Sequence, residues 1–200
     1  MKIHGIEMNE HHYNGLLRTY AGASAIQQVK EKHIDIYMED AWSLFNQVQE
    51  SENLEVNIYI LNSLLLLHAN AFRVDDLDSK VLPLYEKFRI KPDVFTYQHL
   101  TKLYLNLRDL DMVKSLYRKM KKQGLTPNQM LLNNALEAGM RSDDADIIYD
   151  SLLDFIDIKR DPHRRLVIRL NNIKHIPDRI YMLLKQNFSH YGGAVDMRAR

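Results

Sequence analysis

The chain has 200 residues, of which 46% are hydrophobic and 26% are charged, with only 7 glycines and 5 prolines. This composition is typical of a folded, mostly helical protein and excludes a disordered chain or a turn-rich sheet protein. The absence of cysteine excludes disulfides, thiolate metal sites and cysteine nucleophiles, and the net charge of +1 provides no overall attraction to nucleic acid, so an RNA site must come from local charge.

The sequence carries no signal for a membrane or for translocation. The most apolar run, residues 58–67, is about half the length that crosses a bilayer, so no transmembrane helix and no membrane partner are expected. Residues 1–30 lack both the apolar core of a secretory signal and the basic, serine-rich character of an organellar presequence. We therefore recognise no targeting segment in this sequence.

The first nine residues repeat a pattern that occurs again later. Residues 1–9 align without a gap on residues 120–128, with methionine, lysine, glycine and asparagine identical. Because residues 120–128 end one helical hairpin and begin the next, the alignment predicts that the chain opens in the last turn of a helix and is a segment of a longer array. A natural start with a short cap strand is the alternative.

The first hairpin is predicted to contain an interruption. Residues 9–20 have the apolar spacing of a first helix, and residues 41–48 carry the pattern of its partner, delayed by about a dozen residues. In the intervening residues 21–39, Gly22 and Ser24 favour a loop, whereas Ile26 and Val29 favour an extension of both helices. The sequence leaves both possibilities open.

Two more regular hairpins follow. Residues 57–71 form a first helix, and its partner contains apolar residues at helical spacing, with proline near its start where its missing N–H costs nothing: Val81, Pro83, Leu84, Tyr85 and Phe88. The next hairpin has two apolar stripes, from which we expect these core residues: Tyr97, Leu100, Leu116, Tyr117 and Met120. Gly124, which is free to adopt a positive φ, is expected to end its second helix.

The C-terminal part contains two further hairpins. Residues 128–140 and 145–152 form the first of these, with Ser142 as the expected N-cap of the second helix. Asp143, Asp144 and Asp146 lack the glycine and the glutamate of a calcium loop, so we interpret them as first-turn acids stabilised by the helix dipole. Residues 164–173 and 180–188 make a degenerate hairpin, and residues 191–200 are predicted to be a tail.

The prolines reveal the period of these hairpins. Pro92, Pro127 and Pro162 follow one another at intervals of 35 residues, and the first two precede Asp93 and Asn128, whose side chains are preferred helix caps. A helical hairpin of this length cannot bury both of its apolar faces alone. The pattern therefore predicts a stack of hairpins, an α-solenoid.

These residues resemble a known family. The segments 93–97, 116–120 and 124–128 are similar to the pentatricopeptide repeat, the helical hairpin of organellar RNA-binding proteins, and the likeness is most specific in this central unit. The resemblance implies an all-α, right-handed α-solenoid. It also implies these repeats: 1–8 (partial), 9–56 (with the insertion), 57–92, 93–127, 128–162 and 163–200 (a degenerate cap and tail).

The resemblance further implies which residues read RNA bases. In the family, a polar residue in the first turn of one hairpin and the capping residue of the next read one base together. The positions that correspond here are Asn14, Asn57, Asn62, Asp93, Gln98, Asn128, Asn133 and His163. Asn62 with Asp93 resembles the family's uracil-preferring pair, and Asn14 with Asn57 a pyrimidine-preferring one. The pairs Gln98 with Asn128 and Asn133 with His163 depart from the usual combinations.

Two further sets of residues are implied to contact RNA. The residues expected to sandwich the bases, where the family usually has a small aliphatic side chain, are His11, Tyr59, Phe95 and Met130. The sequence leaves open whether these bulkier side chains stack on the bases or block them. The residues expected to contact phosphate are Lys114, Arg118, Lys119, Lys121, Lys122, Arg164, Arg165 and Arg169. These cations lie on a second helix and beyond Pro162, whereas residues 57–71 contain no lysine or arginine. This charge pattern suits docking to folded RNA through phosphates rather than reading of a single strand.

No pattern in the sequence supports catalysis. There is no zinc-protease motif, no phosphate-binding glycine loop and no recognisable nucleophile setting, and the adjacent His11 and His12 are poorly arranged for a metal. We therefore expect no enzyme, cofactor, metal or small-molecule substrate. The resemblance implies a protein of organellar (mitochondrial) gene expression that reads single-stranded RNA along the concave face of its first helices. The alternatives are a structural component of a ribonucleoprotein, such as a mitochondrial ribosome subunit with protein partners, and a tetratricopeptide-like protein-binding scaffold.

Overall fold

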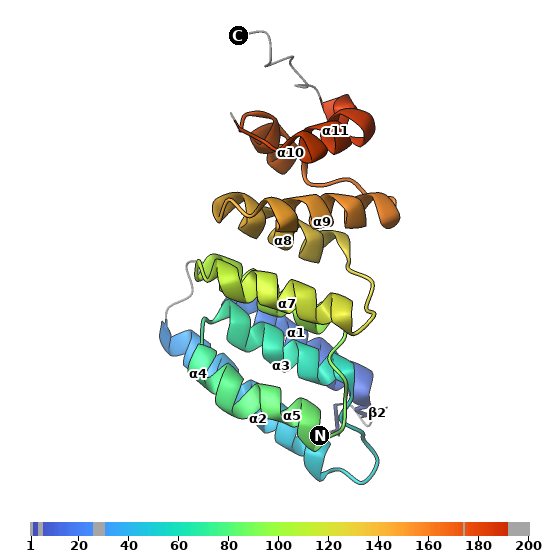
Figure 1. The fold of residues 1–200 in the computed structure, drawn as a ribbon. Coiled ribbons are helices and arrows are strands. Elements are labelled where there is room, and N and C mark those ends of the chain that lie inside the picture. Colours follow the sequence, from blue (N-terminus) through green and yellow to red (C-terminus); the bar gives the residue numbers. More distant parts are fainter. Residues whose placement is uncertain (1, 4–5, 26–30, 174, 192–200) are drawn as a thin grey trace. The chain divides into compact units, whose positions relative to one another are not determined.

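The computed structural model describes residues 2–3, 6–25, 31–173 and 175–191 (Figure 1). The chain divides into two compact units, Met1–His99 and Leu100–Arg200. The prediction of an all-α chain of helical hairpins is confirmed, with a minimal exception at the start. There, β1 (Lys2–Ile3) pairs antiparallel with β2 (Ile6–Glu7), with Lys2 opposite Glu7 and Ile3 opposite Ile6. The expectation of a helical turn in these residues was wrong.

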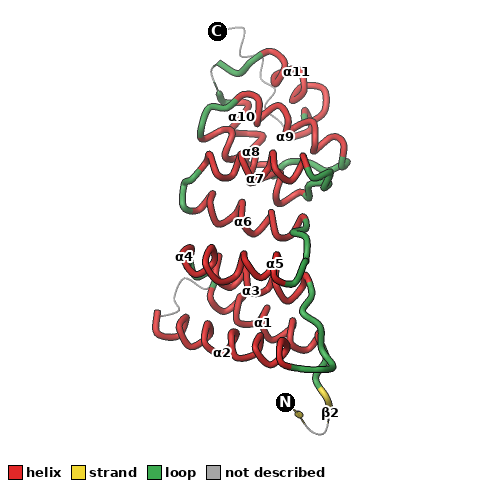
Figure 2. Tube along the Cα trace, turned by 60° about the horizontal axis from the view of Figure 1, so that its bottom comes forward, coloured by secondary structure: helices red, strands yellow, loops and turns green. Residues whose placement is uncertain are grey.

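The first unit is built from paired helices and one irregular second helix. Its elements are α1 (Glu10–Ser24), α2 (Glu31–Glu50), α3 (Ile58–Asn70), α4 (Val74–Asp76), the π-helical turn η1 (Leu77–Val81), α5 (Leu82–Lys87) and the start of α6 (Val94–Asn106). Helix α1 packs on both α2 and α3, and these three lie side by side in Figure 2. Helices α1 and α2 both extend into residues 21–39, so the open question there is decided in favour of longer helices; Ile26 and Val29 lie outside the described residues.

The second unit continues the same construction. Its elements after the end of α6 are α7 (Leu110–Lys122), α8 (Gln129–Arg141), α9 (Ala145–Asp157), α10 (Arg164–Asn171), α11 (Asp178–Asn187) and the 3-10 turn η2 (Ser189–Tyr191). Helix α8 packs against α7 and α9, while α10 packs on α8 and α11 packs on α9. Each helix therefore covers a neighbour one or two positions away in the sequence.

Short polar side chains begin the first helix of successive hairpins. The Oδ1 atoms of Asn9, Asn57 and Asn128 accept backbone N–H groups of α1, α3 and α8 at 2.9–3.2 Å. The Asp93 carboxylate accepts the N–H of Thr96 at 2.9 Å, and the Thr96 hydroxyl accepts the N–H of Asp93 at 3.1 Å, so α6 begins with a reciprocal capping box. His163 caps α10 by accepting the Arg165 N–H at 3.3 Å.

The start of α9 differs from the prediction. Asp144, not Ser142, is the N-cap, because its Oδ1 accepts the Ile147 N–H at 3.1 Å. The Ser142 hydroxyl instead donates to the Ala138 carbonyl at the C-terminal end of α8, at 2.9 Å. Of the three aspartates expected in the first turn, only Asp146 lies there, while Asp143 precedes the cap with a φ of 53°. The Asp144 carboxylate occupies the cap because it is a stronger acceptor than the serine hydroxyl and complements the helix dipole better.

The end of α7 follows the prediction. Gly124 adopts a φ of 72°, and the Leu125 N–H returns to the Met120 carbonyl at 3.3 Å, which closes the helix. At the turns inside the hairpins the same left-handed conformation falls on residues that are not glycine, for example Phe72 and Arg108 with φ of 56° and 62°. These turns carry backbone strain that glycine would not.

The core of each unit follows the apolar stripes. Four of the five predicted core residues of the central hairpin are buried, namely Tyr97, Leu100, Tyr117 and Met120. Leu116 is only half-buried, so that expectation was wrong. The buried residues of α7 are Val113, Tyr117 and Met120, which are spaced by four and three positions, and Leu116 lies beside that stripe and not within it. Within the ranges given above, each helix is too short or too polar to cross a lipid bilayer.

Candidate nucleic-acid interface

The second position of each capped first helix carries a large exposed side chain. Tyr59 is 62% exposed, Phe95 is 52% exposed and Met130 is 55% exposed, and His11 is exposed at the same place in α1. Each lies two residues after its cap, Asn57, Asp93, Asn128 or Asn9, where the side chain points away from the stripe that packs on neighbouring helices. Unpacked rings and a thioether at the same place in these four hairpins are suited to stacking on flat partners such as bases.

The clearest polar site lies between Asn62 of α3 and Asp93 at the start of α6. The Nδ2 of Asn62 donates to Asp93 Oδ1 at 3.0 Å. The Oδ1 of Asn62 accepts from the Tyr85 hydroxyl at 2.9 Å and from the Thr96 hydroxyl at 2.7 Å. Asn62 is only 7% exposed, whereas Tyr59 on the same helix and Phe95 in the first turn of α6 are exposed.

Tyr85 is a permanent donor in this site. Burial raises the pKa of the Tyr85 hydroxyl well above its ordinary value, an effect that the hydrogen bond with Thr96 opposes and the nearby Asp93 charge reinforces. The hydroxyl therefore keeps its proton at any physiological pH. Neither Tyr85 nor Thr96 was among the residues predicted for the site. The available signals were a tyrosine in the apolar stripe of the second helix and a hydroxyl three residues after a capping aspartate.

The other predicted pairs are arranged differently. Asn133 Oδ1 accepts the backbone N–H of His163 at 2.8 Å, and its Nδ2 donates to the Gln129 carbonyl at 2.9 Å, so this pair meets through main chain. Asn14 Oδ1 accepts the Ser63 hydroxyl at 2.6 Å, while Asn57 Oδ1 caps α3. No hydrogen bond joins Asn14 to Asn57 in the part of the chain that is described.

The remaining pair falls on two different units. Gln98 is buried in the first unit, and Asn128 caps α8 in the second, where its Oδ1 accepts the Leu131 N–H at 2.9 Å.

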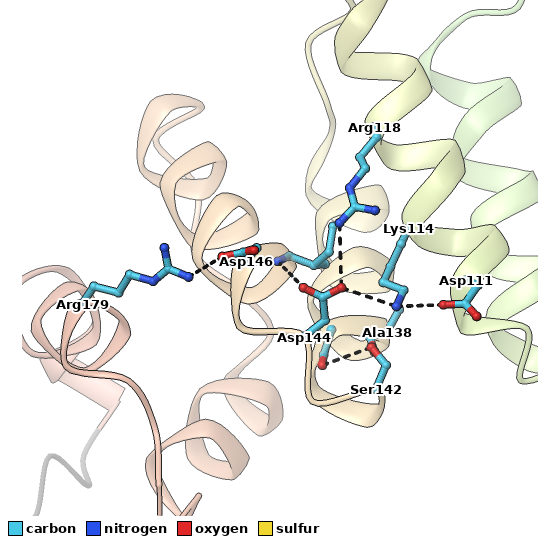
Figure 3. A network of polar contacts seen from close by, with 10 residues as sticks. Asp111, Lys114, Arg118, Ala138, Ser142, Asp144, Asp146 and Arg179 are labelled. Carbon is cyan, nitrogen blue, oxygen red and sulfur yellow. Dashed lines mark hydrogen bonds and ion pairs between the residues drawn. The ribbon is translucent and has the colours of Figure 1, made fainter.

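Half of the predicted phosphate-binding cations are engaged by carboxylates of the same chain. Lys114 lies 2.8 Å from Asp111 and 3.4 Å from Asp144, and Arg118 lies 3.8 Å from Asp144, as Figure 3 shows. Burial alone would raise the pKa of Asp144, but the hydrogen bonds from the Ile147 N–H and Lys114 outweigh it and the pKa is lowered. Asp144 thus stays ionised and holds both cations.

Two more predicted cations are paired in the same way. Lys121 lies 2.7 Å from Asp154, and Arg169 lies 2.6 Å from Glu137, which also pairs with Arg141. Burial would raise the pKa of Glu137, but its two arginines lower it. Four predicted cations remain exposed and have no carboxylate partner among the described residues: Lys119, Lys122, Arg164 and Arg165.

One groove in the first unit is unsuited to nucleic acid. It has a volume of about 800 Å³ and lies between α2 and the α4–η1 segment. Its cations are neutralised, since Arg73 lies 2.7 Å from Asp35 and Lys80 lies 2.7 Å from Asp76, and Glu39 adds further negative charge. Phosphate would be repelled there. In the ranges described, no cluster of three or more histidine, aspartate or glutamate side chains is placed to hold a metal ion.

Comparison with known proteins gives three findings. The sequence profile of the pentatricopeptide repeat domain matches residues 80–138. A chloroplastic pentatricopeptide repeat-containing protein of Arabidopsis thaliana is 34% identical over 97 residues, which is 48% of this chain and only 20% of that protein. The crystal structure of the PPR domain of Arabidopsis thaliana protein-only RNase P 1, in complex with tRNA, matches with a TM-score of 0.54 at 15% identity, covering 94% of this chain and 88% of that one.

Proposed function

This chain belongs to the pentatricopeptide repeat family, and on that premise we propose that it binds single-stranded RNA through the first turns of its first helices. Each base would stack between exposed side chains of successive hairpins and would meet the polar pair at their junction. We take the hairpins to be repeats of about 35 residues with the boundaries expected from the sequence.

The observation that carries this proposal is the contact between Asn62 and Asp93. A first-turn amide and the capping carboxylate of the next helix lie 3.0 Å apart, and exposed Tyr59 and Phe95 lie on the helices that supply them. An amide N–H and a carboxylate offer one donor and one acceptor to a base edge. The family's pairing pattern implies that this junction prefers uracil.

The second candidate function is a structural role on folded RNA. Exposed Lys119 and Lys122 lie on a second helix, and Arg164 and Arg165 begin α10, so these cations are free to meet phosphates. Such docking suits a ribonucleoprotein component, as in a mitochondrial ribosome. We disfavour the protein-binding scaffold on grounds of family, and we propose a binding role without catalysis.

The proposed site of action is an organelle. The relative's name places that protein in the chloroplast, which supports an organellar role and does not favour the mitochondrion expected from the resemblance over the chloroplast. The tRNA in the related crystal structure belongs to another protein at 15% identity and supports only the likeness of the fold.

The experiment compares two kinds of variant on RNA selected from a randomised single-stranded pool. Asn62→Thr removes the amide and should shift the preference at one nucleotide from uracil towards a purine, as the family's pattern implies. Exchanging Lys119 and Lys122 for glutamine should weaken all sequences alike and lower the salt slope by about one for each phosphate that is no longer neutralised. If Asn62→Thr leaves the base preference unchanged while the lysine variant no longer binds RNA, the chain does not read single-stranded RNA, and docking to folded RNA is favoured instead.

A further inference from the structure

The amide of Asn62 is held in one orientation by three neighbours. The Asp93 carboxylate only accepts hydrogen bonds, so the amide end that faces it at 3.0 Å must be the NH₂ group. The other end, Oδ1, then receives the hydroxyls of Tyr85 and Thr96 at 2.9 and 2.7 Å. Turning the amide over would set its carbonyl oxygen against a carboxylate and would break the hydrogen bonds with Asp93 and with both hydroxyls.

Asp93 determines which end of the amide faces it, and Tyr85 is the donor that holds the other end, Oδ1, inward. The single hydroxyl proton of Thr96 has competing acceptors, because Thr96 Oγ1 lies 2.7 Å from Asn62 Oδ1 and 3.0 Å from Asp93 Oδ1 and also makes a hydrogen bond with the Tyr85 hydroxyl. Whenever Thr96 donates to Asp93, the Tyr85 hydroxyl is the remaining donor to the Asn62 carbonyl. Tyr85 is buried, so it serves this role without reach to a ligand.

We propose that Tyr85 is a specificity-determining positioning residue for the nucleotide at this junction. From the second helix of the same hairpin, it holds the Asn62 carbonyl inward, so that an N–H and not a C=O faces the base. Of the four hydrogen bonds that an asparagine amide makes, two on Oδ1 and one on Nδ2 are used inside the protein, which leaves one N–H. This inference rests on the proposed function.

The consequence for base choice follows from the edges of the pyrimidines. Uracil has a carbonyl acceptor at ring position 4, whereas cytosine has an amino donor there. A fixed N–H matches the uracil carbonyl and opposes the cytosine amino group. An amide that lacks the Tyr85 hydrogen bond is held less firmly and opposes cytosine less. Tyr85 therefore favours uracil over cytosine without touching either. The exposed ring of Tyr59 is expected to stack equally well on uracil and on cytosine.

The test uses the whole chain and synthetic RNA. Single-stranded RNA is first selected from a randomised pool, and each nucleotide is then varied to find the position at which Asn62→Thr changes the base preference. At that position the ratio of uracil to cytosine affinity is measured for the wild type and for Tyr85→Phe. The ratio should fall by about tenfold, the size of one base-edge hydrogen bond, with other positions unchanged.

Two further variants separate positioning from general weakening. Tyr117→Phe removes a buried tyrosine hydroxyl at a similar place on α7, but that hydroxyl donates to Asp154 and not to a first-turn amide, so its uracil-to-cytosine ratio should equal that of the wild type. Thr96→Val removes the second donor to Asn62 Oδ1 and should shift the ratio in the same direction as Tyr85→Phe.

The outcomes distinguish this inference from the function beneath it. Circular dichroism and thermal unfolding first establish that the Tyr85→Phe protein is folded. If this folded protein keeps the wild-type ratio of uracil to cytosine affinity, the role of Tyr85 is overturned, while the proposed binding of single-stranded RNA is unaffected. The same holds if Tyr117→Phe lowers the ratio equally, because the effect would then be a loss of stability. If Asn62→Thr changes the base preference at no nucleotide of the RNA, both the proposed reading of single-stranded RNA and the role of Tyr85 are rejected.

Discussion

The Tyr117 hydroxyl is predicted to stabilise the second unit through Asp154. It donates to Asp154 Oδ2 at 2.5 Å, and Lys121 reaches Asp154 Oδ1 at 2.7 Å, so both oxygens of a carboxylate that is 7% exposed are engaged. This cluster joins α7 to α9. Tyr117→Phe keeps the ring and removes only the hydroxyl, which leaves one oxygen of a buried charge without its donor.

The size of the effect follows from what remains around Asp154. A hydrogen bond to a charged group contributes about 1.5–3 kcal/mol, and Lys121 keeps the carboxylate partly compensated, so we expect the free energy of unfolding to fall by about 2 kcal/mol. Lys121→Met should cost less, under about 1 kcal/mol, because its side chain is 39% exposed and its attraction is screened by solvent.

Urea denaturation followed by circular dichroism measures both changes, and a double-mutant cycle of Tyr117→Phe with Asp154→Asn isolates the pair. For a chain of this length, about 2 kcal/mol corresponds to a lowering of the melting temperature by about 4–8 °C. The reasoning is refuted if Tyr117→Phe costs less than about 0.5 kcal/mol, or if the coupling energy in the cycle is near zero while both single variants are destabilised.

Three further measurements test other parts of the fold. Burial holds the pKa of His68 below its ordinary 6.5, so around this pH the folded state binds fewer protons than the unfolded state. The free energy of unfolding, measured by urea titration, should therefore fall as the pH drops below about 6.5. The variant His68→Leu should lack this dependence on pH. Leu131→Ala should lower the free energy of unfolding by about 2–5 kcal/mol because Leu131 is fully buried. Leu116→Ala should lower it clearly less because Leu116 is only half-buried. Equal losses would show that the periphery of α7 packs as tightly as the core. Arg108→Gly should raise the melting temperature and Gly124→Ala should lower it, because each position has a positive φ that only glycine adopts without strain. Each change in the free energy of unfolding should be about 1 kcal/mol. If both substitutions shifted the melting temperature in the same direction, the argument from backbone strain would be wrong.

Much of the helical framework could be predicted from the sequence because its causes are local. A period of three to four residues defines each apolar stripe, and asparagine or aspartate before it satisfies the free N–H groups of the first turn, as at Asn57 and Asn128. Gly124 ends α7 for an equally local reason. These features depend on a few neighbouring residues and not on the rest of the fold.

The errors arose where the outcome depends on residues distant in sequence or on competition between similar ones. The alignment of residues 1–9 on a helical ending failed because identical residues at four positions do not by themselves determine a helix, and Ile3 pairs with Ile6 between two short strands. Ser142 lost the cap position to Asp144, which is also drawn to Lys114 and Arg118 of another hairpin. Those ion pairs link residues about thirty positions apart, and nothing in a charge pattern selects the partner of a given lysine.

The two junctions that the structure describes in most detail use the same residue type in opposite ways. Asn62 turns its NH₂ group to the next hairpin and its carbonyl to Tyr85, whereas Asn133 turns its carbonyl to the His163 N–H and its NH₂ group to its own helix. Exchanging aspartate for histidine at the junction replaces a side-chain acceptor by a main-chain donor, and the amide reverses to suit it. If this edge reads RNA, we therefore expect discrimination at the Asn62 junction to exceed that at Asn133, although a pattern of first-turn asparagines would rank them alike.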